Sequence, residues 1–189
     1  MNIVVRSRDK YCICRPDTSW ERENKPVYAQ EAVQGYDFAP VLFVRICKAG
    51  KCIAEKFASR YYDAFNFGIL LSGRLRLGED SGTRASVSDC LDHSSILPFP
   101  LFNPIVLENE EKNFVFQACG KDTYIYNGGT PEMVHKAISE VSSLVSLRIG
   151  DLVAIELQSP APLCSRSDER ISIRGEFLGN ETFATEIIF

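Results

Sequence analysis

Short runs rich in Val, Ile, Phe and Tyr recur along nearly the whole chain, and Gly, Pro, Asn and Asp separate them. Residues of the first group favour strands, and residues of the second group favour turns. This alternation constrains the chain to a mainly β (α+β) architecture with few helices. The predicted strands are 2–5, 11–14, 41–47, 65–77, 113–119, 123–126, 152–157, 170–173 and 182–189.

One segment has helical rather than strand periodicity. Thr130 can cap a helix, Pro131 suits its first position, and Glu132 lies in the first turn, where the helix dipole favours a carboxylate. Apolar residues then recur at three- and four-residue spacing, which predicts a helix lying on a sheet. The stripe consists of Val134, Ile138, Val141 and Val145. A shorter helix is predicted at 56–63.

Length and charge exclude several classes of protein. The chain has 189 residues, which fits a single domain. Its 21 basic and 25 acidic residues give a net charge of −4 without a basic stripe, which argues against a nucleic-acid partner. Pro or charged residues interrupt every apolar run, so we expect no membrane span and no signal peptide. The expected location is the cytoplasm.

The seven cysteines are odd in number and scattered, which is typical of reduced thiols rather than of a disulfide framework. Cys47 and Cys52 flank Ala49-Gly50, so we expect them to face each other across a hairpin as packed thiols. A redox pair is a less favoured interpretation, because no neighbour would lower a thiol pKa. Cys90 and His93 could supply half of a zinc site, but the chain has only two histidines to complete it.

Four segments together resemble the fumarylacetoacetate hydrolase family. They are CRPDTS (14–19), VRICKAGKCIAEKFASRYYDAFNFGI (44–69), GGTPEMVHKAISEVSSLVSLRIGDL (128–152) and ISIRGEFLGNETFATEII (171–188). The resemblance covers most of the chain in family order. It implies a mixed β-sandwich roll around a flattened barrel, here as a single domain over 1–189 with a shortened N-terminal segment. It also implies a homodimer.

The same resemblance implies a metal-assisted reaction on 2-oxo acids or diketones. In the family, a Glu-x-Glu pair and an Asp hold Mg²⁺ or Mn²⁺. Here the corresponding positions are Ala39, Val41 and Leu70, while an alternative register places Asp37 and Ala39 at the pair. Alkyl groups cannot replace the oxygen ligands that Mg²⁺ requires. We therefore expect a lost metal site and no cofactor, with Asp37 as a weak remnant.

Other elements of the family pattern are absent as well. As the resemblance implies, the N-terminal segment that carries a His-Glu pair in the family is deleted, Asp89 stands where the family has Lys, and Leu75 replaces a second acid. The family's TGTP loop corresponds to 155–158, which reads IELQ. These losses favour a non-catalytic binding or assembly protein.

An alternative hypothesis is a hydrolase, decarboxylase or isomerase with a rebuilt site in the same cleft. Two arginines could grip a small carboxylate ligand, and His93 could serve as a base. The simpler interpretation is that these charged residues shape turns and ion pairs. The candidates are Arg15, Asp17, Arg74, Asp92 and His93, with Asp37 and Asp89 beside them.

A third hypothesis is a partner subunit that pairs with an intact homologue instead of forming a homodimer. The apolar, Pro-broken segment 94–106 is a candidate interface, although it fits a core-lining loop equally well.

Overall fold

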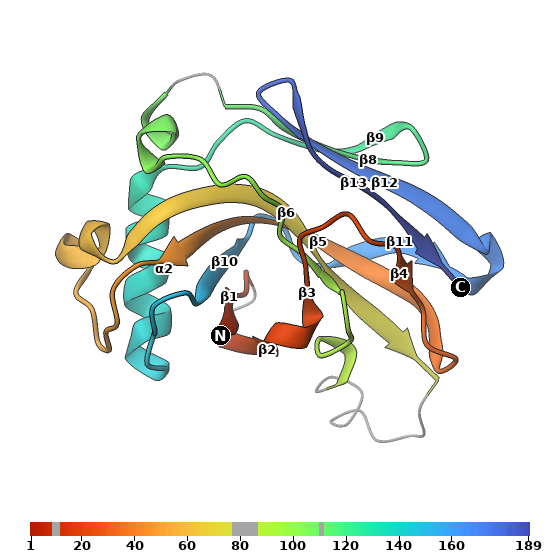
Figure 1. Cartoon of the computed structure of the whole chain (residues 1–189), viewed down its shortest axis with the longest axis horizontal. Helices are drawn as coiled ribbons and strands as arrows, with labels where there is room; N and C mark the ends of the chain where they lie inside the picture. Colours follow the sequence, from red (N-terminus) through yellow and green to blue (C-terminus); the bar gives the residue numbers. More distant parts are fainter. Residues whose placement is uncertain (9–11, 77–86, 110–111) are drawn as a thin grey trace.

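The computed structural model describes residues 1–8, 12–76, 87–109 and 112–189. Within this part, an eight-stranded sheet and a five-stranded sheet make up most of the molecule (Figure 1). The larger sheet runs β2 (Cys12–Pro16), β1 (Asn2–Arg6), β10 (Leu152–Glu156), β5 (Val33–Ile46), β6 (Tyr62–Leu75), β7 (Ser95–Ile96) and β3 (Trp20–Glu21), and β11 (Ala161–Ser165) also pairs with β5. The smaller runs β4 (Val27–Tyr28), β13 (Asn180–Ile188), β12 (Arg170–Phe177), β8 (Phe114–Ala118) and β9 (Lys121–Tyr126).

The predicted mainly β fold with few helices is confirmed. The long helix is α2 (Pro131–Leu144), where the Thr130 hydroxyl accepts a hydrogen bond from the Met133 amide, as a capping residue should. The remaining described helical turns are η1 (Asp17–Ser19), η2 (Glu55–Arg60), η3 (Pro104–Glu108) and η4 (Arg166–Asp168). The helix predicted at 56–63 is thus a 3-10 helix that ends earlier. Tyr11 and Leu77, which end two predicted strands, lie outside the described residues.

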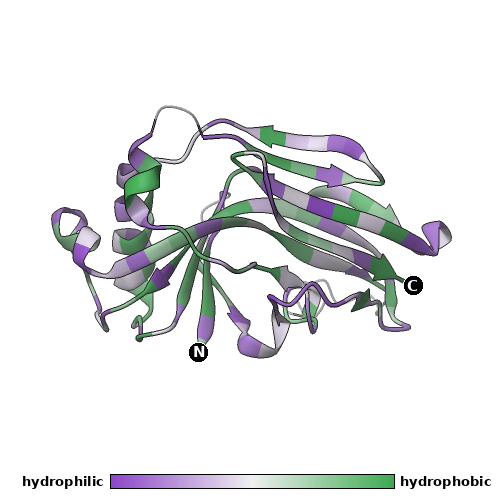
Figure 2. Cartoon of the chain, turned by 45° about the horizontal axis from the view of Figure 1, so that its top comes forward, coloured by the Kyte–Doolittle hydropathy of each residue, from purple (hydrophilic) through white to green (hydrophobic). Residues whose placement is uncertain are grey.

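The smaller sheet and α2 cover one face of the larger sheet. Figure 1 shows β8, β9, β12 and β13 above the long curved strands β5 and β6, with α2 standing at one end. The main core lies between these layers, and Phe67 packs there against Phe114 and Phe177 with ring centroids 5.1 and 4.8 Å apart. Figure 2 shows the apolar colour following the long strands through the centre of the molecule.

The opposite face of the larger sheet holds a second apolar cluster. Successive side chains of a strand point to opposite faces, so Leu42 joins the main core while Val41 and Phe43 join the second cluster. The members of this inner cluster are Ile3, Val5, Val41, Phe43, Leu70, Leu97, Leu152 and Ala154. Because both faces of β5, β6 and β10 are buried, these strands read as continuous apolar runs.

The hairpin predicted at 47–52 is wrong. Gly50 forms a bridge with Leu147, and the Cys52 amide donates to the carbonyl of Ser142, so this loop pairs with the end of α2 instead of with itself. β5 instead pairs with β6 along its whole length, from Val33 with Leu75 to Ile46 with Tyr62. Tertiary hydrogen bonds have overridden a local turn signal. Within the described ranges, Cys12, Cys14, Cys47, Cys52, Cys119 and Cys164 form no disulfide.

Arg15 links β2 to β6, which is not its neighbour in the strand order, and so helps to curl the larger sheet toward a barrel. It lies on β2, at one end of the strand order, and donates from Nη1 to the carbonyl of Leu71 on β6 at 2.8 Å. Its Nη2 donates to Asp89 Oδ1 at 2.7 Å and to Ser72 Oγ at 3.2 Å. Only 3% of the Arg15 side chain is exposed, and burial lowers the pKa of its guanidinium. Asp89 supplies the opposing charge that a buried cation needs.

Replacing Gly68 by alanine should weaken the pairing of β6 with β7. A Cβ at Gly68 would lie 2.3 Å from the carbonyl oxygen of Ile96, which is backbone and cannot move alone. We expect Gly68→Ala to lower the free energy of unfolding by about 1–3 kcal/mol, measured by urea denaturation. Gly73→Ala on the same strand is the control, because its Cβ would meet the end of the flexible Leu91 side chain. Equal effects of the two substitutions would contradict this account.

Arg15→Met should destabilise the protein much more than the loss of a surface ion pair. It leaves the half-buried Asp89 without its cation and the Leu71 carbonyl without its donor, which costs about 3 kcal/mol, whereas Arg45→Met breaks an exposed pair with Asp63 and should cost at most about 1 kcal/mol. The double change Arg15→Met with Asp89→Leu should recover much of the loss. Chemical denaturation of the four proteins tests this, and an Arg15→Met stability equal to that of Arg45→Met would refute it.

Candidate functional site

The three positions that the sequence resemblance predicts to match metal ligands meet on the inner face of the larger sheet. Ala39 and Leu70 are direct partners in the β5–β6 register, and Val41 lies opposite Gly68 of β6 and Glu156 of β10. Their exposed fractions are 2%, 1% and 0% for Ala39, Leu70 and Val41. The backbone thus brings the three positions together, but their side chains are buried alkyl groups, and those of Val41 and Leu70 pack in the inner cluster.

Asp37 is the nearest carboxylate along β5 toward the end of the barrel. It is the register partner of Ser72, and one of its carboxylate oxygens lies 3.6 Å from Arg74 Nε. Arg74 also donates from Nη2 to the carbonyl of Cys164 at 2.5 Å. Asp37 is therefore part of an ion pair at the edge of the inner cluster, one pleat beyond Ala39.

Arg15 and Asp89 form a closed polar group rather than an open binding site. Ser72 Oγ donates to Asp89 Oδ1 at 2.6 Å, and Arg15 Nη1 lies 3.4 Å from Ser94 Oγ. Both terminal nitrogens of Arg15 are therefore engaged within the protein. Within the described residues Arg15 Nε is buried without a hydrogen-bond partner. The sequence interpretation of Asp89 as a simple charge reversal missed that it neutralises Arg15.

His93 lies at a separate surface pocket of about 400 Å³, which Asp17 and Trp20 also line. Its Nδ1 is 2.8 Å from Glu21 Oε2, and its backbone amide donates to the carbonyl of Thr18. Asp92 is exposed on the turn before it. The hydrogen bond to Glu21 holds the imidazole in one orientation, with Nε2 as the other ring nitrogen.

Sequence reasoning missed Glu21, whose side chain is only 3% exposed. Its Oε1 accepts hydrogen bonds from the amides of Glu23 at 2.6 Å and Lys25 at 3.2 Å, so its charge is satisfied by backbone donors. The segment WERENK (20–25) is rich in charged residues, which is typical of a solvent-exposed segment. Nothing in its spacing indicates that Glu21 is buried. Glu156 is a similar case: it is buried and accepts from Ser7 Oγ at 2.9 Å.

The three residues proposed for a rebuilt site make different contacts. Arg15 binds Asp89, Arg74 binds the carbonyl of Cys164, and His93 binds Glu21. In the part of the chain that the structure covers, no group of three or more His, Cys, Asp or Glu side chains is arranged to hold a metal ion. The same part of the chain contains no helix with the length and apolar character needed to span a bilayer.

No family model and no curated protein matches the sequence, but solved structures match over almost the whole chain. A fumarylacetoacetate hydrolase family protein from Yersinia pestis CO92 superposes with a TM-score of 0.76 at 18% identity, covering 99% of this chain and 92% of that one. Fumarylpyruvate hydrolase from Pseudomonas aeruginosa, solved with Mn²⁺ and pyruvate, gives 0.70 at 16% identity, covering 100% and 88%.

A third match is 5-carboxymethyl-2-hydroxymuconate delta-isomerase from Mycobacterium smegmatis, with a TM-score of 0.78 at 12% identity over 99% of this chain and 78% of that one. At these identities the likeness concerns the arrangement of the chain in space. The described sheets, their order and their near-closure into a barrel agree with it. The chain therefore has the fold of the fumarylacetoacetate hydrolase family.

Proposed function

We propose that this chain is a fumarylacetoacetate hydrolase-like protein that has lost the divalent-metal site and serves in binding or assembly. The observation that carries the proposal is the inner cluster at Ala39, Val41 and Leu70. Val41 and Leu70 belong to this cluster, Ala39 is the register partner of Leu70, and all three residues are closed to water. The residues at this place do not fit Mg²⁺ or Mn²⁺.

The energetics of a hard dication support the loss. Mg²⁺ keeps its water unless oxygen ligands replace that water in near-octahedral geometry. The methyl groups of Ala39, Val41 and Leu70 offer no oxygen and no negative charge. Two neighbouring carboxylates already have partners, whereas Asp37 Oδ1 is buried without a hydrogen bond in the described part of the chain. Asp89 pairs with Arg15, and Glu156 accepts from Ser7. Asp37 lies near Arg74 and would have to exchange that cation for the metal.

The proposed assembly role is that of a subunit, either in a homodimer or in a complex with an intact homologue. In the segment 94–106, Ile96 and Leu97 line the core, whereas Phe99 is 42% and Ile105 is 64% exposed. The exposed part supports a contact surface, since aromatic and aliphatic groups are enriched in the cores of interfaces. The six described cysteines other than Cys90 form no disulfide, which favours a reducing compartment such as the cytoplasm.

The wild-type protein should not bind Mn²⁺ stoichiometrically in a calorimetric titration, because the inner cluster provides no ligands. Stoichiometric binding with low-micromolar affinity would refute the proposal. Asp37→Asn is the control that identifies any weak surface binding through the remnant carboxylate.

Restoring the ligands should restore metal binding. We expect Ala39→Glu, Val41→Glu and Leu70→Asp together to destabilise the metal-free protein, because buried carboxylates lack counter-charges. Mn²⁺ should then raise the thermal midpoint of the triple variant and leave that of the wild type unchanged. A triple variant that is equally stable with and without Mn²⁺ would show that these positions do not correspond to a metal site.

Self-association through the exposed apolar residues is tested by sedimentation. We expect the wild type to sediment as a dimer, and Phe99→Ser with Ile105→Ser to sediment as a monomer that still unfolds cooperatively. Val87→Ser, also at an exposed apolar residue, is the control. A wild type that is monomeric when pure argues for the intact-homologue alternative, and a double variant that remains dimeric rules out this surface.

A further inference from the structure

The Cys12-Ile13-Cys14 segment places two thiols side by side on an edge strand. Residues i and i+2 of a strand point to the same face, and β2 is the terminal strand of the larger sheet. Cys12 packs at the margin of the main core, while Ile13 packs on the inner cluster, so both thiols lie on the face that α2 covers. The Cys14 side chain lies near enough to contribute to the raised pKa of Cys12.

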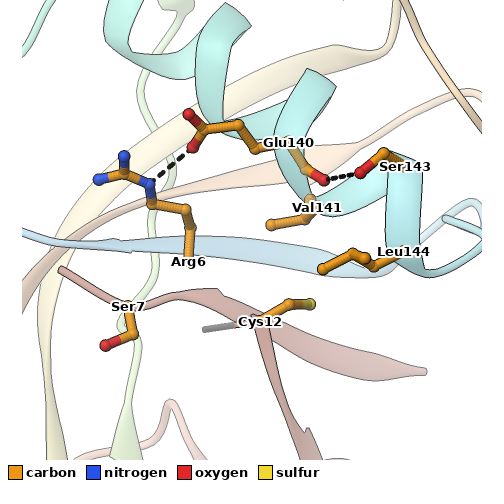
Figure 3. A pocket seen from close by; sticks show the side chains of 7 residues that line it. All are labelled: Arg6, Ser7, Cys12, Glu140, Val141, Ser143 and Leu144. Carbon is orange, nitrogen blue, oxygen red and sulfur yellow. Dashed lines mark hydrogen bonds and ion pairs between the residues drawn. The ribbon is translucent and has the colours of Figure 1, made fainter. Parts of the chain in front are cut away.

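The two thiols differ in their exposure to solvent. Cys14 is exposed, and Cys12 is half-buried in the wall of a cavity of about 350 Å³ between the β-sheet and α2. Figure 3 shows that cavity, with Arg6 turned toward Glu140 and Cys12 on the opposite wall near Leu144. The Arg6 to Glu140 ion pair, at 2.8 Å, engages the cation that would otherwise neutralise a nearby thiolate.

We propose that Cys12 and Cys14 form a binding site for a soft monovalent metal ion of the copper(I) class. Thiolates are the ligands that select such ions, and copper(I) accepts two-coordinate geometry. Binding displaces the thiol protons to solvent and leaves the oxidation states of sulfur and copper unchanged. Zinc fits poorly, since a structural zinc ion takes four ligands.

The electrostatics of the pair favour a cation over oxidation chemistry. Burial and the neighbouring Cys14 raise the pKa of Cys12 to about 11, so the thiolate is not activated as a nucleophile. A soft cation between the sulfurs removes the repulsion that opposes two thiolates. Because protons are released on binding, the apparent affinity should fall as the pH is lowered.

Copper(I) titration against a chromophoric competitor, under nitrogen and with the thiols fully reduced, tests the site. The wild type should bind one ion more tightly than Cys12→Ser or Cys14→Ser, each of which should lose about 100-fold in affinity, because a single thiol lacks the gain from a second tethered ligand. Cys52→Ser, which removes another exposed thiol, is the control and should bind as the wild type does.

Thermal midpoints establish that the three variants are folded, and copper X-ray absorption of the wild type should show sulfur neighbours that are reduced in both site variants. Unchanged affinity in Cys12→Ser and Cys14→Ser would overturn the site, as would an equal loss in Cys52→Ser. The inference does not depend on the proposed loss of the divalent-metal site, because manganese and copper(I) titrations report on opposite faces of the larger sheet.

Discussion

Strand alternation on β5 and β6 is the constraint on which the rest of the structure depends. Each strand has fourteen residues and is buried on both faces, so one set of side chains enters the main core and the other enters the barrel. Because the period is two, a shift of one residue would exchange the two sets. The identities at positions 39, 41 and 70 therefore decide directly whether the barrel contains ligands or an apolar filling.

The apolar filling and the closure by Arg15 belong together. A barrel that holds a metal ion needs polar ligands in its interior, whereas this one is filled by the inner cluster, and the buried Arg15 links β2 to β6. Asp89 neutralises the charge of Arg15, so this link leaves no buried cation without a counter-charge. In this arrangement Arg15 and Asp89 contribute to the architecture of the barrel.

Much of the fold could be predicted from sequence because it follows from local patterns. The capping Thr130 and the stripe of α2 are local, and so is the strand character of most runs. Because a proline such as Pro40 argues against a central strand, the sequence predicts a strand that begins at residue 41, whereas β5 begins at Val33. Pro40 is tolerated because β5 changes partner there, from β10 at Val41 to β11 at Phe38, so its missing N–H leaves no gap in either ladder. The site contacts of Arg15 and Glu21 depend on residues distant in sequence, which no spacing reveals.

The central claim is that alkyl groups have replaced the divalent-metal ligands inside the barrel. Anomalous diffraction from crystals soaked in manganese tests it most directly, because it reports where the ion lies and what coordinates it. The account predicts no anomalous peak in the space bounded by Ala39, Val41 and Leu70. A strong peak there, coordinated by oxygen atoms of this chain, would contradict it.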